Sequence, residues 1–103
     1  MDKQFIISEI INKLSILPDI DKIIIFGSFV KSDTPCDLDI AVFSSSHDNY
    51  LTLALNYRKS LRDLTKIIPL DVIPLKTDIR DCSFLNEINS GEVIYERRNR
   101  YMA

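Results

Sequence analysis

The spacing of hydrophobic residues changes along the chain between a helical and a strand-like pattern. Asp2–Leu17 repeats apolar residues at helical spacing, and Pro18 ends the pattern. Asp21–Phe26 instead holds the unbroken apolar run IIIF, which is typical of a strand that is buried on both faces of a sheet. The same reasoning predicts further strands at Asp37–Phe43 and Ile68–Leu75 and further helices at Tyr50–Lys66 and Thr77–Asn89. A single turn of helix is expected at Ser28–Ser32 and a short extended segment at Glu92–Glu96.

The order of these segments predicts an α/β or α+β fold, in which a small mixed sheet is flanked by helices. The chain has 103 residues, enough for one domain that buries roughly 60 to 70% of its unfolded surface. We therefore expect a single domain over residues 1–103, with residues 94–103 as a basic C-terminal tail. The helix at Tyr50–Lys66 is expected to turn four leucines inward: Leu51, Leu55, Leu61 and Leu64.

The composition excludes several classes of function. The formal net charge of −2 argues against a protein whose main partner is nucleic acid, because such domains carry a basic surface. Cys36 and Cys82 are far apart and form no Cys/His cluster, so we expect neither a zinc site nor a disulfide framework. The N-terminal segment does not look like a signal peptide, and no stretch is long and apolar enough to cross a membrane. The expected location is the cytoplasm.

Three carboxylates interrupt the apolar pattern of the predicted strands. Asp37 and Asp39 are two residues apart, so on a strand their side chains leave the same face, with Cα atoms about 6.5 Å apart. Asp71 lies in the middle of the third predicted strand. Carboxylates in partly buried positions are costly unless a cation accompanies them. Three hard oxygen ligands suit Mg²⁺ or Mn²⁺ rather than zinc.

The pair Gly27-Ser28 follows the first predicted strand and offers a place for phosphate. Glycine allows a close approach of the backbone, and N–H groups at a strand-to-helix turn favour an anion. Ser28 adds a hydroxyl donor. Magnesium sites with few carboxylates take further ligands from substrate phosphates and water. A phosphate cradle followed by metal-binding acids therefore predicts phosphoryl or nucleotidyl transfer.

Each of these features also has a simpler explanation. A Gly-Ser pair after a strand can be only a turn, Asp37 can cap N–H groups in a loop, and Asp71 can be a surface residue on an edge strand.

His47 is the only histidine and lies in a polar loop, where we expect it to be solvated. Four basic residues of the helix at Tyr50–Lys66 are expected to form a solvated face rather than a site for triphosphate or RNA: Arg58, Lys59, Arg62 and Lys66.

The stretch GSFVKSDTPCDLDIAV resembles the signature of the DNA polymerase β-type nucleotidyltransferase superfamily: Gly-Ser, a short loop, Asp-x-Asp on a strand, and a third Asp on a later strand. The segments ILPDIDKIIIFGS, LDVI and INSGEVIYE extend the resemblance over nearly the whole chain, to the minimal nucleotidyltransferases of prokaryotes. The resemblance implies a polymerase β-like fold. The chain departs from the family at Val30, Lys31 and Ser32, where a small residue, a basic residue and glycine are frequent. Lys31 keeps the charge without the planar fork of arginine.

The resemblance implies a metal-dependent enzyme that transfers a nucleoside monophosphate, expected to be AMP from ATP, to an acceptor hydroxyl. Two Mg²⁺ or Mn²⁺ ions would be held by the three acids, and Asp71 is also placed to help activate the acceptor. The implied metal-binding and catalytic residues are Asp37, Asp39 and Asp71, and the implied nucleotide-binding residues are Gly27, Ser28 and Lys31.

The acceptor is expected to come from another chain, because 103 residues leave no room for an acceptor-binding domain. Minimal nucleotidyltransferases are often paired with a small all-helical HEPN protein, as an antitoxin with its toxin, so the resemblance implies that partner and protein AMPylation. The main alternative is a catalytically weak or inactive module of the same fold that neutralises a HEPN-type partner by contact. A phosphorylation receiver ranks lower, because it expects repeated βα units in a longer chain. The oligomeric state stays open, a homo-oligomer included.

Overall fold

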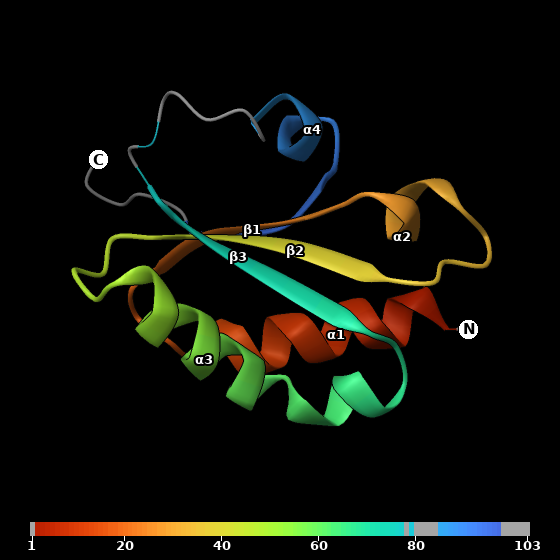
Figure 1. The fold of residues 1–103 in the computed structure, drawn as a ribbon, viewed down its shortest axis with the longest axis horizontal. Coiled ribbons are helices and arrows are strands. Elements are labelled where there is room, and N and C mark those ends of the chain that lie inside the picture. The colour runs from red at the N-terminus through yellow and green to blue at the C-terminus, as the bar shows by residue number, and fades with distance from the viewer. Residues whose placement is uncertain (1, 78, 80–84, 98–103) are drawn as a thin grey trace.

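The computed structural model describes residues 2–77, 79 and 85–97 (Figure 1). Helices and strands follow one another in nearly the predicted order. The elements are α1 (Lys3–Leu14), β1 (Ile20–Phe26), α2 (Ser28–Lys31), β2 (Leu38–Ser44), α3 (Tyr50–Ser60), the 3-10 helix η1 (Arg62–Lys66), β3 (Leu70–Lys76), α4 (Leu85–Asn89) and β4 (Glu92–Glu96).

The four strands form one mixed sheet in the order β3-β2-β1-β4. β1 lies in the middle and pairs antiparallel with both β2 and β4. β2 and β3 are parallel, because the chain crosses back through α3 and η1 before it enters β3. The predicted small mixed sheet is therefore confirmed. β3 and β4 are its two edges.

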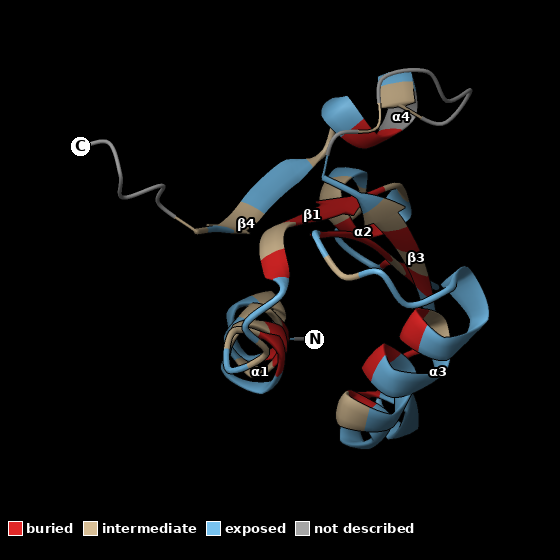
Figure 2. Cartoon of the chain, turned by 90° about the vertical axis from the view of Figure 1, so that its left-hand side faces the viewer, coloured by how far each residue is buried: buried red, intermediate tan, exposed pale blue. Residues whose placement is uncertain are grey.

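Helices cover both faces of this sheet. α1 and α3 lie on one face, and the short α4 lies on the other (Figure 1). Alternate residues along each strand point to the two sides, so Ile40 and Val42 join the larger core under α1 and α3, whereas Ala41 and Phe43 join a smaller core that includes Ile88 of α4. Figure 2 shows the buried positions gathered on the strands and on the sides of α1 and α3 that face them.

The first helix is shorter than its apolar pattern predicts. Its N-terminus is capped by Asp2, whose side chain accepts a hydrogen bond from the N–H of Phe5 at 3.1 Å. It ends at Leu14 and not at Leu17. Pro18 explains the difference, because in a continued helix its ring would clash with the carbonyl of Leu14. Residues 15–19 turn instead and lead into β1.

The rotational position predicted for α3 is wrong. Leu51 and Leu55 are 65% and 58% exposed, although both were expected to face inward. Leu53 and Tyr57 occupy the buried positions on α3. The chain then continues the same buried stripe through Leu61 and Leu64, the two leucines for which the prediction is confirmed.

The short extended segment predicted at Glu92–Glu96 is confirmed as β4. Residues 94–96 therefore belong to the sheet and not to the predicted tail, since Tyr95 pairs with Ile23 of β1. The rest of the predicted tail, residues 98–103, lies outside the described residues, as do Cys82 and most of the first half of the helix predicted at Thr77–Asn89. Within the described part of the chain, none of the helices has the length and apolar character needed to cross a membrane.

Candidate functional site

The register of the parallel strands brings two of the three predicted acids together. Asp39 of β2 and Asp71 of β3 are direct partners in the ladder. Neighbouring strands lie about 4.8 Å apart, so the two side chains stand side by side on one face of the sheet. That face is the one with the smaller core, because Asp39 alternates with the buried Ile40 on the other side. Asp39 is half-buried, and Asp71 is exposed at the sheet edge.

Gly27 lies directly against Asp39. It ends β1 with φ of 78° and ψ of −150°, a conformation that residues with a side chain rarely adopt. An ideal Cβ atom at this position would fall 2.5 Å from Oδ2 of Asp39. The absence of a side chain at Gly27 thus lets the turn after β1 approach the carboxylate on β2.

Ser28 and Asp37 close the loop between β1 and β2. The Ser28 hydroxyl donates a long hydrogen bond of 3.4 Å to the backbone carbonyl of Asp37. Asp37 is exposed and stands one residue before β2. Lys31 is exposed in the last turn of α2. The segment is tied to α1 where Lys3 Nζ donates to the carbonyl of Ser32 at 2.6 Å.

The donor chemistry of the acids fits a hard divalent cation. Asp39 and Asp71 offer adjacent carboxylate oxygens, the ligands that Mg²⁺ takes in combination with water and substrate phosphates. Among the residues that the structure describes, no group of three or more His, Cys, Asp or Glu side chains is gathered closely enough to hold a metal. A site of all three acids therefore requires Asp37 and Asp71, both exposed, to turn toward Asp39.

A pocket of about 490 Å³ joins the two acids to α3. Asp39 and Asp71 line it from the face of the sheet with the smaller core, and α3 lies on the opposite face, so the pocket reaches around the edge strand β3. Arg58 of α3 donates from Nη2 to the backbone carbonyl of Leu70 on that edge strand at 3.2 Å. The other lining residues are Phe26, Val72 and Ile73 from the sheet and Tyr50, Leu51, Ala54 and Leu55 from α3.

Arg58 is the residue of this pocket whose position the sequence did not indicate. It was expected on a solvated helix face, and it is exposed, yet it lies on the same pocket as the acids. Its spacing of three and seven residues from Leu55 and Leu51 places these three side chains on one face of α3. That spacing could have indicated the position, had the inward face of α3 been assigned correctly.

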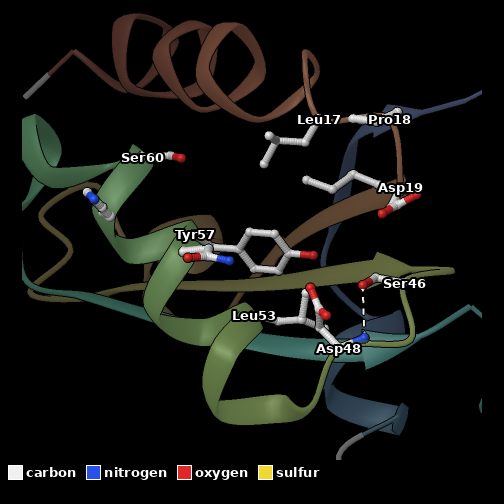
Figure 3. Close-up of a pocket in the computed structure, with 11 residues that line it drawn as sticks. Leu17, Pro18, Asp19, Ser46, Asp48, Leu53, Tyr57 and Ser60 are labelled. Carbon is white, nitrogen blue, oxygen red and sulfur yellow. Dashed lines mark hydrogen bonds between the residues drawn. The ribbon is translucent and has the colours of Figure 1, made fainter.

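A second pocket, of about 320 Å³, lies at the opposite end of the sheet (Figure 3). It is lined by Asp19, ahead of β1, by Asp48, after β2, and by the ring of Tyr57 from α3. Tyr57 is 3% exposed, and burial raises the pKa of its hydroxyl above the usual 10.0. The two nearby carboxylates raise this pKa further, and a hydrogen bond with Ser44 partly opposes the rise. This pocket is separate from the one that holds Asp39 and Asp71.

Comparison with known proteins places the chain in a family. Residues 8–100 match the family model for polymerase beta nucleotidyltransferases. A search of curated proteins finds no match. Because the family match covers most of the chain, it includes the glycine turn after β1 and the strands β2 and β3 that carry Asp39 and Asp71.

The fold of this chain is similar to that of chains in solved toxin–antitoxin complexes. A chain of the complex between a tri-AMPylated Shewanella oneidensis HEPN toxin and an MNT antitoxin superposes with a TM-score of 0.60 and 22% identity, covering 93% of this chain and 74% of that chain. A chain of the MntA–HepT toxin–antitoxin complex gives 0.55 and 22%, with 91% and 73% covered. A toxin–antitoxin complex with AMP-PNP gives 0.58 and 21%, with 89% and 74% covered. The polymerase β-like fold predicted from the sequence is confirmed.

Proposed function

The chain belongs to the polymerase β nucleotidyltransferase family, and we propose that it transfers a nucleoside monophosphate, AMP from ATP, to a hydroxyl group. The observation that carries this proposal is the meeting of Asp39 with Asp71 beside the glycine turn at Gly27. Carboxylates next to an open backbone turn suit a substrate that carries both phosphate and divalent metal.

The proposed roles follow the positions of the residues. Asp37, Asp39 and Asp71 would hold two Mg²⁺ or Mn²⁺ ions, which neutralise the charge of the phosphates when bound. The backbone at Gly27 and the Ser28 hydroxyl would bind the triphosphate, with Lys31 supplying positive charge. In the reaction the acceptor oxygen bonds to the α-phosphorus, and the bond from that phosphorus to the bridging oxygen breaks, releasing pyrophosphate. Asp71, exposed at the edge of the sheet, can accept the proton of the acceptor hydroxyl on a carboxylate oxygen.

The proposed partner is a HEPN-type protein. Solved relatives of the same fold are MNT antitoxins in complex with a HEPN toxin, and in one of them the toxin is tri-AMPylated. We propose that this chain acts in the same way, as an antitoxin that modifies or binds its partner in the cytoplasm.

A module that acts by contact alone is the second candidate. Val30, Lys31 and Ser32 stand where the family often has a small residue, a basic residue and glycine, and Lys31 is exposed on the last turn of α2. If these residues lower the affinity for the triphosphate, binding of the partner remains as the main activity. If replacing one of the three acids abolished neutralisation of the partner while binding of the partner stayed unchanged, this second candidate would be contradicted.

Calorimetric titration with ATP tests the proposal directly. The chain should bind ATP in the presence of Mg²⁺, and Asp39→Asn should abolish that binding while the fold stays intact by circular dichroism. Asp63→Asn is the matched control, since Asp63 is an exposed carboxylate on η1. Absence of Mg²⁺-dependent binding in the native chain would contradict catalysis by the isolated domain and favour the contact module.

A further inference from the structure

The residues proposed to bind the triphosphate belong to one short turn of helix. Gly27 precedes α2, and Ser28 and Lys31 are its first and last residues. The N–H groups of Val30 and Lys31 donate to the Gly27 carbonyl at 3.1 and 3.3 Å. The N–H of Ser32 donates to the Ser28 carbonyl at 2.9 Å. A helix this short gains little stability from its own hydrogen bonds, so contacts with other elements must hold its orientation.

Lys3 of α1 supplies such a contact at the end of α2. Its Nζ donates to the backbone carbonyl of Ser32, the C-cap residue of α2, at 2.6 Å in a partly buried place. The same Nζ lies 5.3 Å from the centre of the Phe29 ring, which belongs to the larger core. One ammonium group thus binds the residue that ends the turn and the buried ring that follows Ser28.

The first helix itself gives little reason for a lysine at this position. Lys3 is the first residue of α1, directly after the cap Asp2. The partial positive charge at the start of a helix disfavours a cation there. The carbonyls at the end of a helix favour one, and the Lys3 ammonium lies at the end of α2. The contact between the two helices therefore accounts for the charge at Lys3.

Ser32 carries the contact with Lys3 into the loop before β2. Its hydroxyl oxygen accepts a hydrogen bond from the N–H of Thr34 at 3.0 Å. Its φ of −113° and ψ of 146° are extended, so the backbone here does not require the glycine that is frequent in the family. The Ser28 hydroxyl reaches the carbonyl of Asp37 at the other end of the loop. The loop is thus fastened to α1 at Ser32.

We propose that Lys3 is a positioning residue for the triphosphate. By binding the end of α2, it fixes the orientation in which Gly27 and Ser28 meet the phosphates. Its ammonium group lies at the end of α2 opposite to Gly27, so Lys3 acts through the turn rather than on the nucleotide. This inference rests on the proposed function and adds a residue from outside the motif to the same site.

Three variants of the full chain test the effect on nucleotide binding. Lys3→Met removes the ammonium group and keeps an unbranched side chain, whereas Lys3→Arg keeps a cation. Lys13→Met is the control, since Lys13 is exposed in the last turn of α1. Calorimetry should show an affinity for ATP with Mg²⁺ that is about three- to tenfold lower in Lys3→Met. Lys3→Arg should largely restore it, and Lys13→Met should leave it unchanged.

Hydrogen–deuterium exchange without nucleotide measures the effect on α2 itself. The amides of Val30, Lys31 and Ser32 should exchange at least about threefold faster in Lys3→Met than in the native chain. The amides of Ile23–Ile25 in the central strand β1 are the internal reference and should not change. A general loss of stability would accelerate both sets, so the comparison separates positioning from a merely structural role.

The outcomes separate this inference from the proposed function. Unchanged exchange in α2, equal acceleration in β1, or an unchanged ATP affinity in Lys3→Met would each overturn the inference while native ATP binding still supports the proposed function. Lower affinity with unchanged exchange would show that the charge of Lys3 acts at a distance, which also overturns it. Absence of Mg²⁺-dependent ATP binding in the native chain would overturn the proposed function and this inference together.

Discussion

Oδ2 of Asp39 lies 2.5 Å from the place where a β-carbon on Gly27 would stand. Gly27 also has φ of 78°, so two independent constraints act on the same residue. The first is a steric contact with Asp39, and the second is a backbone conformation that side chains disfavour. The turn after β1 and the carboxylate on β2 therefore fit together only with glycine at this position.

Gly27→Ala should damage the site through both constraints. The added methyl group must displace the Asp39 carboxylate, and the strained backbone costs about 1–3 kcal/mol of stability. We expect Mg²⁺-dependent ATP binding to weaken at least about tenfold, as calorimetry would measure. Ser8→Ala, on an exposed position of α1, is the control for a small change far from the acids. Native-like binding in Gly27→Ala would show that Asp39 need not lie against the turn.

Asp39 and Asp71 should have separable roles in transfer. Asp39 lies between the turn at Gly27 and Asp71, so Asp39→Asn should abolish transfer and weaken ATP binding together. Asp71 is proposed to accept the proton of the acceptor hydroxyl, so Asp71→Asn should lower turnover more than it lowers ATP binding. Steady-state rates beside calorimetry measure the two effects. Unchanged activity of Asp39→Asn would contradict a metal-dependent reaction at this pair.

Part of the candidate site could be indicated from the sequence, because it depends on short spacings. The apolar run IIIF before Gly27, and Asp39 within the next strand, need only strand periodicity to be recognised, whereas Asp37 stands one residue before β2. The side-by-side placement of Asp39 and Asp71 depends on the parallel pairing of β2 with β3. Periodicity does not determine that pairing, and the expectation that Asp71 lies near the other acids needed the structure to test it.

Other features could not be obtained from local patterns. The leucines of α3 form two stripes, and the choice between Leu53 and Leu55 as the inward residue depends on how α1 and the sheet pack against the helix. The pocket position of Arg58 follows from the same choice. The extended segment at Glu92–Glu96 was predicted, but its antiparallel pairing with β1 was not, because pairing depends on a strand far away in the sequence.

Gly91→Ala should destabilise the fold near β1. A Cβ atom on Gly91 would clash with the backbone carbonyl oxygen of Ile25 and would fall 2.8 Å from Cβ of Phe26. A backbone atom in a central strand cannot move freely, so we expect a loss of about 1–3 kcal/mol in the free energy of unfolding. Urea denaturation measures this loss as a lower midpoint. Glu92→Ala, an exposed neighbour, is the control and should unfold at nearly the native midpoint.

Tyr57 should make the stability of the chain fall at high pH. Burial raises the pKa of its hydroxyl above 10.0 in the folded state, the hydrogen bond with Ser44 opposes part of this rise, and the charges of Asp19 and Asp48 add smaller increases. In the unfolded chain the same hydroxyl loses its proton near pH 10. The folded state therefore binds more protons than the unfolded state above that pH. The stabilising contribution is complete below about pH 10 and is lost as the pH rises from there through the folded pKa.

Urea midpoints between pH 8 and pH 11 measure this effect in the native chain and in Tyr57→Phe. At pH 8 the variant should be less stable by about 0.5–1.5 kcal/mol, because it loses the hydrogen bond with Ser44. Above pH 10 the native midpoint should fall more steeply than that of the variant, so the two curves converge. All other groups are common to both proteins, so their effects cancel in the difference. Parallel curves over the whole range would show that the Tyr57 hydroxyl has the same pKa in the folded and unfolded states.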